Sequence, residues 1–285
     1  MAAFRRIAIV GVGLIGGSIG LAVRRRLRNA QVVGVDRGGV LRRALARGAV
    51  HTGTASLARG LQGCDLVILA LPVDAIARAL PRVARLAPAG ALVTDVGSTK
   101  GAIVAAARRC GLGRRFVGGH PMAGSERSGV AHADGRLFMG APWILSPGAA
   151  GTVATERVRR LVRRLGARPA LIEARRHDAI VARLSHLPQL ASVAMVNAAA
   201  RGPAAGALRL AGPAFRQMSR LAGSSPRLWE GILESNREAV VRALRDFERE
   251  IAGLRGSIGS GAAASFRRAA RLRARIPPPP VALGR

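Results

Sequence analysis

The chain has 285 residues, of which 49% are hydrophobic, enough for about two domains with a sizeable core. This composition excludes a disordered chain, in which low hydrophobicity accompanies high charge. The 46 basic residues exceed the 15 acidic ones by 31, and two cysteines are too few for a disulfide framework, which favours a reducing, cytoplasmic location.

The N-terminal segment predicts a strand, a glycine turn and a helix. Ile7–Val10 is a short β-branched run, typical of a strand buried on both faces. The pattern Gly11-x-Gly13-x-x-Gly16 follows directly, and a helix is predicted from Gly16 to Leu27. Arg5 and Arg6 before this apolar run also resemble a secretory signal. Because the run carries glycines and has no small-residue cleavage pattern after it, we interpret it as a folded segment.

Predicted strands and helices then alternate along the chain. The strands are Gln31–Val35, Leu66–Leu71, Ala91–Val96 and Arg115–Gly118, and the helices are Val40–Gly48, Ala75–Leu86 and Lys100–Cys110. This alternation predicts βαβ units and a parallel sheet. No other stretch reaches 18 uninterrupted apolar residues, so we expect no membrane span.

The regular alternation of predicted strands and helices ends at a long loop, residues 119–140. Two further strands, Trp143–Ser146 and Ala170–Ile172, flank a helix at Thr152–Leu165, and only helices follow, at His177–Ala200, Pro213–Leu221 and Ser225–Ile258. We therefore predict a dinucleotide-binding α/β domain at residues 1–173, an all-α domain at residues 174–276 and a solvated proline-rich tail at residues 277–285.

The glycine turn carries the first functional prediction. Gly11 allows a tight turn, Gly13 lets the backbone approach a pyrophosphate, and Gly16 lets helix and strand pack closely. Asp36 lies 20 residues past Gly16, at the end of the next strand. A carboxylate there binds a ribose diol and repels a 2′-phosphate, which favours NAD over NADP, although the neighbouring Arg37 weakens that preference.

The same turn also fits a hydrolase motif. Gly16, Ser18 and Gly20 match G-x-S-x-G, which places a nucleophilic serine on a strained turn. Ser18 falls past the turn, within the predicted helix, and no convincing Asp and His pair follows. We therefore interpret Ser18 as a packing residue.

Further candidates follow the ends of neighbouring strands. In open parallel sheets the carboxyl ends of the strands form the ligand-binding edge. Leu71 and Pro72 end one strand there, Ser98 and Lys100 follow the next, and His120 follows a third. A histidine on a glycine-rich segment at this edge is a candidate acid or base. Lys100 is either a site residue or a solvated helix start.

Several motifs together resemble a known family. The segments GVGLIGGSIG, VGVDR, LALPV, DVGSTKG, GGHPMAGSERSG and HDAIVARLSHLPQLAS occur in order between Ile7 and about Trp229. They resemble the prephenate/arogenate dehydrogenases of tyrosine biosynthesis. The resemblance implies a Rossmann-type NAD-binding domain followed by a helical domain that forms a homodimer. It also implies a small-molecule substrate, prephenate or arogenate, which is oxidised and decarboxylated to 4-hydroxyphenylpyruvate or tyrosine.

The resemblance also implies residue roles. His120 matches the family's catalytic histidine, Ser98 binds the same substrate hydroxyl or orients the imidazole, and Arg220 holds a substrate carboxylate. The implied substrate side includes Glu126, Lys100, His186 and Gln189, and the implied cofactor side includes Gly11, Gly13, Leu14, Ile15, Gly16, Asp36, Arg37, Leu71, Pro72 and Ser98.

The chain departs from the family pattern at two positions. Gln189 stands where many members have histidine, and Gln217 stands where some have an acid that gates the site with one like Glu126. The roles of His186 and Asp178 stay open between function and structure. No His or Cys cluster has metal-ligand spacing, so we expect no metal.

Two alternatives to this function remain. One is another two-domain dehydrogenase of the β-hydroxyacid or imine reductase type, which takes its catalytic lysine or acid from the helical domain. The other is a basic, non-catalytic protein that binds nucleic acid. Because 45 of the 46 basic residues are arginines scattered along the chain, we interpret the charge as a composition bias and expect neither nucleic acid nor membrane as a partner.

Overall fold

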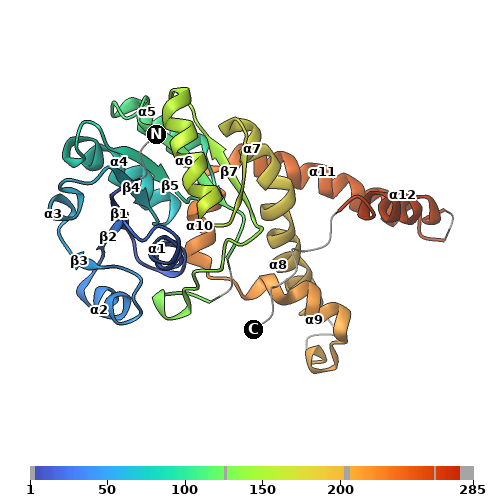
Figure 1. Cartoon of the computed structure of the whole chain (residues 1–285). Coiled ribbons are helices and arrows are strands. Elements are labelled where there is room, and N and C mark those ends of the chain that lie inside the picture. The colour runs from blue at the N-terminus through green and yellow to red at the C-terminus, as the bar shows by residue number, and fades with distance from the viewer. Residues whose placement is uncertain (1–3, 125–126, 202–205, 260, 277–285) are drawn as a thin grey trace.

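A computed structural model describes residues 4–124, 127–201, 206–259 and 261–276. One eight-stranded sheet dominates the first part of the chain, with the strand order β3-β2-β1-β4-β5-β6-β7-β8 (Figure 1). The strands are β1 Arg6–Val10, β2 Gln31–Val35, β3 Thr52–Thr54, β4 Leu66–Leu69, β5 Leu92–Asp95, β6 Phe116–Pro121, β7 Pro142–Ser146 and β8 Arg168–Leu171.

The predicted parallel sheet is confirmed for β1–β6, and β8 also lies parallel to β7. β7 runs antiparallel to β6, with His120 opposite Ile144. Parallel strands are usually connected by an α-helix, whereas the one helical element among the described residues between β6 and β7 is a short 3₁₀ turn at Val130–His132. The three-residue strand β3 was not predicted, because its sequence Thr-Gly-Thr has no apolar pattern.

Six helices cover the two faces of the sheet. They are α1 Leu14–Arg26, α2 Gly38–Ala46, α3 Leu57–Leu61, α4 Val73–Leu86, α5 Gly101–Arg109 and α6 Thr152–Arg164. Alternate residues of a strand point to opposite faces, so each face has its own core. Ile9 belongs to the cluster that contains Ile19 of α1 and Val158 of α6. Val67 belongs to the second cluster, with residues of α4 and α5.

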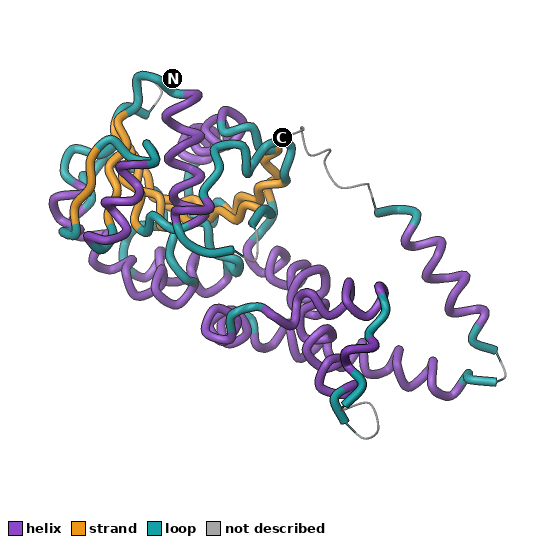
Figure 2. Tube along the Cα trace, turned by 90° about the horizontal axis from the view of Figure 1, so that it is seen from below, coloured by secondary structure: helices purple, strands orange, loops and turns teal. Residues whose placement is uncertain are grey.

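Among the described residues after β8, every regular element is a helix or a helical turn. They form α7 Ala174–Val181, a π-helical turn Ala182–His186, α8 Leu187–Ala199, a 3₁₀ turn Leu208–Leu210, α9 Pro213–Ser219, a 3₁₀ turn Arg220–Gly223, α10 Pro226–Ser235, α11 Arg237–Gly256 and α12 Ala263–Arg273. The predicted helix Ser225–Ile258 is therefore two helices that break at Asn236, and α12 was not predicted. Figures 1 and 2 both show α12 standing away from the sheet.

Among the contacts that join the helical part to the sheet part, two position α7 and α10. Ile232 of α10 is buried in the core cluster that also contains residues of α4. Asp178 of α7 accepts hydrogen bonds from the backbone N–H groups of Lys100 and Gly101, at the start of α5. These contacts hold α7 and α10 beside the carboxyl ends of β5 and β6.

One described helical stretch, Ala174–Ala199, is long and apolar enough to cross a membrane by length and composition alone. Only 28% of its most apolar window is buried. A single match of this kind is weak evidence, because the core helices of soluble proteins pass the same test. The absence of a membrane span therefore stays a prediction.

Candidate active site

The glycine turn after β1 has the geometry of a phosphate cradle. Gly11 has a φ of +91°, and a Cβ atom there would lie 2.3 Å from the carbonyl oxygen of Ala70. A Cβ atom on Gly16 would lie 2.0 Å from the carbonyl oxygen of Gly11. A Cβ atom on Gly13 would meet nothing within 4 Å, just before α1 begins at Leu14. The turn thus packs tightly on two sides and is open at the helix N-terminus, which fits a dinucleotide pyrophosphate.

The Asp36 carboxyl group is a hydrogen-bond acceptor held in place beside this turn. Its Oδ2 accepts a hydrogen bond of 2.7 Å from the backbone N–H of Val12, and its Oδ1 accepts one of 2.7 Å from that of Arg37. The carboxyl group is half-buried and the Arg37 side chain is exposed. The other expected cofactor residues, Leu14, Ile15, Leu71, Pro72 and Ser98, are half-buried or exposed and lie near the carboxyl ends of β1, β4 and β5.

A buried ion pair lies below the same edge of the sheet. Lys100 Nζ pairs with Asp95 Oδ2, and both side chains are fully buried. Asp95 also accepts hydrogen bonds from the backbone N–H groups of Gly97, at 2.8 Å, and Gly119, at 3.0 Å. Burial lowers the pKa of Lys100, and the Asp95 carboxylate opposes that shift. The pair therefore ties the end of β5 to β6.

The interpretation of Lys100 as a solvated helix start is wrong, because its side chain is fully buried. Its role as a site residue stays a prediction. The reason for its burial is Asp95, five residues earlier at the end of β5, whose carboxylate draws the ammonium group under β6. A Cβ atom on Gly118 would lie 3.2 Å from the Lys100 side chain. Lys100 thus supports the strand that carries His120.

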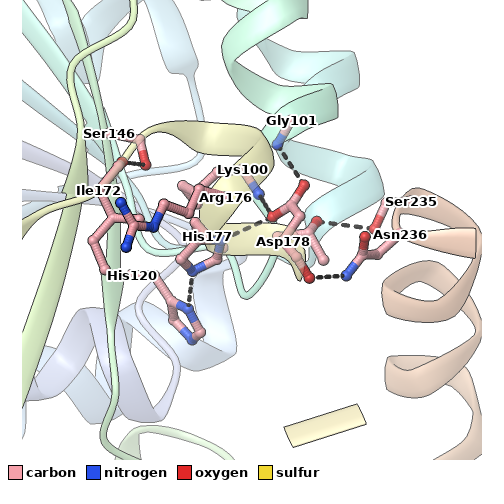
Figure 3. A network of polar contacts seen from close by, with 12 residues as sticks. Lys100, Gly101, His120, Ser146, Ile172, Arg176, His177, Asp178, Ser235 and Asn236 are labelled. Carbon is pink, nitrogen blue, oxygen red and sulfur yellow. Dashed lines mark hydrogen bonds and ion pairs between the residues drawn. The ribbon is translucent and has the colours of Figure 1, made fainter. Parts of the chain in front are cut away.

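His120 ends a chain of polar contacts that crosses from the sheet to the helical part (Figure 3). Its Nδ1 lies 2.9 Å from Nε2 of His177, and Nδ1 of His177 lies 2.8 Å from Oδ1 of Asp178. His120 is half-buried, whereas His177 is fully buried. Burial holds the pKa of His120 well below 6.5, and the positive charge of the neighbouring Lys100 lowers it further. A neutral imidazole at this edge can accept a proton.

Sequence reasoning missed two members of this cluster, His177 and Asp95. Asp95 begins the quoted motif DVGSTKG, which contains Ser98, at the end of a predicted strand, and this position is a usable signal. His177 begins the quoted motif HDAIVARLSHLPQLAS, but nothing local indicates that it reaches a residue 57 positions earlier. Asp178, whose role was left open, contacts both His177 and the start of α5.

His186 and Gln189 are both buried and contact other groups of the protein, and their expected roles toward a substrate stay predictions. His186 is buried, its ring packs edge-on against Trp229, and its Nδ1 lies 3.3 Å from Nδ2 of Asn236. Burial lowers the pKa of His186 to about 4, against the opposing charge of Asp178. Gln189 is buried too, and both polar atoms of its side chain are engaged within the helical part.

The contacts of Gln189 fix the segment that carries Arg220. Gln189 Nε2 donates to the carbonyl oxygen of Leu221 at 2.7 Å. From the same helix, Ser192 Oγ donates to the carbonyl oxygen of Met218 at 2.9 Å and accepts from the N–H of Ala222 at 3.1 Å. Arg220 lies between these anchors and is exposed. Gln217 is also exposed, and Glu126 lies outside the described residues.

No group of three or more metal-ligating side chains occurs among the described residues. A dinucleotide cradle and a neutral histidine share one edge of the sheet, and an arginine lies on an anchored segment of the helical part. This arrangement suits hydride transfer coupled to proton removal from a hydroxyl group.

Comparisons with known proteins agree with this chemistry. The family model described as the prephenate dehydrogenase nucleotide-binding domain matches residues 19–171, and that described as the prephenate dehydrogenase dimerization domain matches residues 173–272. The prephenate dehydrogenase of Bacillus subtilis is 34% identical over 87% of this chain and 69% of its own length.

Solved structures of two relatives are similar over nearly the whole chain. Prephenate dehydrogenase from A. aeolicus, in complex with hydroxyphenyl propionate and NAD+, has a TM-score of 0.91 and 28% identity, covering 97% of this chain and 99% of its own. Arogenate dehydrogenase from Synechocystis has a TM-score of 0.79 and 30% identity, covering 94% of this chain and 96% of its own.

Proposed function

This chain belongs to the prephenate dehydrogenase family, and we propose here how its own residues perform the reaction of that family. It is an oxidoreductase of tyrosine biosynthesis that acts as a prephenate/arogenate dehydrogenase. The reaction removes a hydride and a hydroxyl proton from a cyclohexadienol ring, and the ring carboxylate leaves as CO2.

We propose NAD as the cofactor, held at Gly11, Gly13 and Gly16. The open side of Gly13 at the N-terminus of α1 supports this assignment, as does the NAD+ bound by the relative from A. aeolicus. Asp36 would accept the hydroxyl groups of the adenine ribose. Leu14, Ile15, Arg37, Leu71, Pro72 and Ser98 would complete the contacts. The bound cofactor supplies the hydride acceptor.

We propose His120 as the base. Its depressed pKa keeps the ring neutral near pH 7, so a ring nitrogen can take the hydroxyl proton as the hydride leaves. The carboxylate carbon–carbon bond then breaks, and its electron pair enters the ring, which becomes an aromatic phenolate. His120 returns the proton to that oxygen, so no proton is gained or lost by the enzyme over the cycle. Ser98 would bind the same oxygen or orient the imidazole.

We propose that Arg220 binds a substrate carboxylate. The guanidinium group pairs both oxygens of a carboxylate at once, and its segment is anchored to α8 from both sides. Glu126 stays a proposed gating residue from the resemblance alone.

We propose a homodimer that forms through the helical part. The buried core cluster within that part contains only Ala182, Ala239, Val240 and Ala243. Several large apolar side chains of the same part are exposed, among them Leu184, Leu210, Met218, Ile258 and Phe266. A cavity of about 460 Å³ also lies between α11 and α12, lined by Leu254, Phe266 and Leu272. A second copy would cover these surfaces.

The two free cysteines fit a cytoplasmic location.

The half-buried His120, at the same edge of the sheet as the dinucleotide cradle, is the observation that carries the mechanism. The test is the formation of reduced nicotinamide, followed by its absorbance, with prephenate and with arogenate, each paired with NAD and with NADP. We expect turnover of at least one substrate with NAD. An enzyme that oxidises neither substrate with either cofactor would contradict the proposed function.

A further inference from the structure

The contacts of Asp178 determine which ring nitrogen of His177 carries a proton. A backbone N–H group can only donate a hydrogen bond. Asp178 Oδ1 accepts from the N–H of Lys100 and Oδ2 accepts from that of Gly101, each at 2.7 Å. Both oxygens are thus acceptors, so Nδ1 of His177, at 2.8 Å from Oδ1, must be a donor.

The same argument continues to His120. If His177 carries a single proton and that proton is on Nδ1, its ring presents a lone pair at Nε2. Nδ1 of His120 lies 2.9 Å from that nitrogen, so it must carry a proton and donate it. A neutral His120 that is protonated at Nδ1 has its lone pair on Nε2. Two hydrogen bonds therefore fix the tautomer of His120.

Asp178 is itself held by groups from two other elements. Its carboxyl group binds two N–H groups at the N-terminus of α5, where the helix dipole favours a negative charge. Its carbonyl oxygen accepts a 2.8 Å hydrogen bond from Nδ2 of Asn236, at the break between α10 and α11. Figure 3 shows Asp178 between these partners, with His177 on the side of His120.

We propose that His177 and Asp178 are positioning residues that hold His120 in the tautomer with an unprotonated Nε2. This proposal rests on the proposed role of His120 as the base. In this tautomer the unprotonated nitrogen accepts the substrate proton. When His120 becomes positively charged, its Nδ1–H continues to donate to His177, and the Asp178 carboxylate lies beyond that ring. The two residues thus serve both the resting base and its charged form.

The tautomer can be read directly by ¹⁵N NMR of histidine-labelled protein. The chain has only five histidines, so single His→Phe variants assign the signals. In the unsubstituted protein at neutral pH we expect His120 to show a protonated Nδ1 and an unprotonated Nε2. His177→Phe removes the acceptor while Asp178 keeps its hydrogen bonds to α5, and His120 should then show a mixture of tautomers. An unchanged His120 spectrum in this variant would overturn the proposal.

Asp178→Asn tests the other end of the chain. An amide turned with its N–H₂ toward His177 would reverse the tautomer of that ring and, through it, that of His120. Because the same change perturbs the N-terminus of α5, it is interpreted only where circular dichroism and thermal unfolding show a folded protein. If Asp178→Asn does not fold, the test rests on His177→Phe.

Kinetics separate a positioning role from a structural one. His177→Phe should lower kcat by about 10- to 100-fold, less than the roughly 10²–10⁴-fold effect of removing a general base, with little change in KM for prephenate or NAD. In a His120→Asn background the same change should have no further effect, since it acts through His120. His132→Phe, which replaces an exposed histidine, is the matched control and should leave kcat unchanged.

Two other results are distinguishable. An equal loss from His177→Phe in the presence and absence of His120 would show a structural role and overturn the proposal. Full kcat in His120→Asn alone would instead overturn the proposed base, whatever the effect of His177.

Discussion

His120 is a half-buried ring whose pKa is held well below 6.5 by burial and by nearby positive charge. Only the neutral ring accepts a proton, so activity is lost when pH falls below that depressed pKa. We predict that kcat/KM stays level as pH decreases through about 6.5, the ordinary histidine value, and falls only at more acidic pH. The measurement is a pH–rate profile, restricted to the range in which the fold is intact by circular dichroism.

His120→Asn removes the base and keeps a polar group of similar size. It should lower kcat by about 10²–10⁴-fold and abolish the acid limb of the profile, while NAD affinity is retained. The same acid limb in the residual activity of the variant would assign the titration to another group.

A second single residue, Asp36, is predicted to set the preference for NAD over NADP. Its carboxyl group lies beside the glycine turn through its hydrogen bond with Val12, where a 2′-phosphate would meet negative charge. We predict a higher kcat/KM with NAD than with NADP. Asp36→Asn keeps a hydrogen-bond acceptor for the turn but removes the negative charge. It should lower the ratio of kcat/KM with NAD to kcat/KM with NADP by about tenfold, near the lower end of the roughly 1.5–3 kcal/mol that a charged hydrogen bond contributes. Equal kcat/KM values in the unsubstituted enzyme would refute the preference.

At the scale of elements, α8 holds the 3₁₀ turn that carries Arg220. If Arg220 binds a carboxylate, Arg220→Ala should raise the KM for prephenate strongly. The rise corresponds to a loss of about 2–4 kcal/mol of binding free energy. Gln189→Ala leaves Arg220 in place but removes the hydrogen bond to Leu221. It should raise the same KM by about fivefold, the value of one neutral hydrogen bond.

The exposed Gln62 is a matched control for this prediction. Gln62→Ala should leave every kinetic constant unchanged. A KM for prephenate that does not respond to Gln189→Ala would show that the anchoring of the turn does not contribute to substrate binding.

His186 links the α7–α8 stretch to α10 and α11, and its contacts make this junction sensitive to acid. Its pKa is lowered to about 4 in the folded protein, so on acidification the unfolded chain takes up a proton first, near pH 6.5. Its contribution to stability is therefore complete above about pH 6.5 and is lost between there and pH 4. Each unit of difference between the folded and unfolded pKa of His186 corresponds to about 1.4 kcal/mol, so the loss of stability is at most roughly 3 kcal/mol.

His186→Gln, which does not titrate, should show a smaller decrease in the free energy of unfolding over this range. Urea denaturation at pH 7 and at pH 4.5 measures the difference. An identical decrease in both proteins would mean that other groups account for the acid sensitivity.

At the scale of the whole molecule, the exposed apolar surface of the helical part predicts association. Phe266 and Leu272 of α12 are 70% and 52% exposed and line the cavity against α11. We predict a dimer by light scattering at micromolar concentration. The double variant Phe266→Arg, Leu272→Arg should shift it toward monomer. Val153→Arg, on the sheet part and 57% exposed in the unsubstituted chain, should remain dimeric. A monomeric unsubstituted protein would contradict the prediction.

The amino-acid sequence by itself determined the local patterns of this protein. The glycine turn, the strand that ends at Asp36 and the placement of His120 at the carboxyl edge all follow from residues near one another in the chain. The alternating apolar segments likewise predicted seven of the eight strands that the structure describes. These features are local because backbone conformation and binary pattern act over a few residues.

Only the tertiary structure decided what the polar side chains contact. Lys100 is buried because the sheet brings Asp95 to it, and Gln189 is engaged because α8 packs on the turn after α9. His177 reaches His120 only because Asp178 docks α7 on the start of α5. The direction of β7 and the break at Asn236 also depend on distant partners. Each of these contacts joins segments far apart in the chain, and burial and hydrogen bonding between such segments depend on packing that no local pattern encodes.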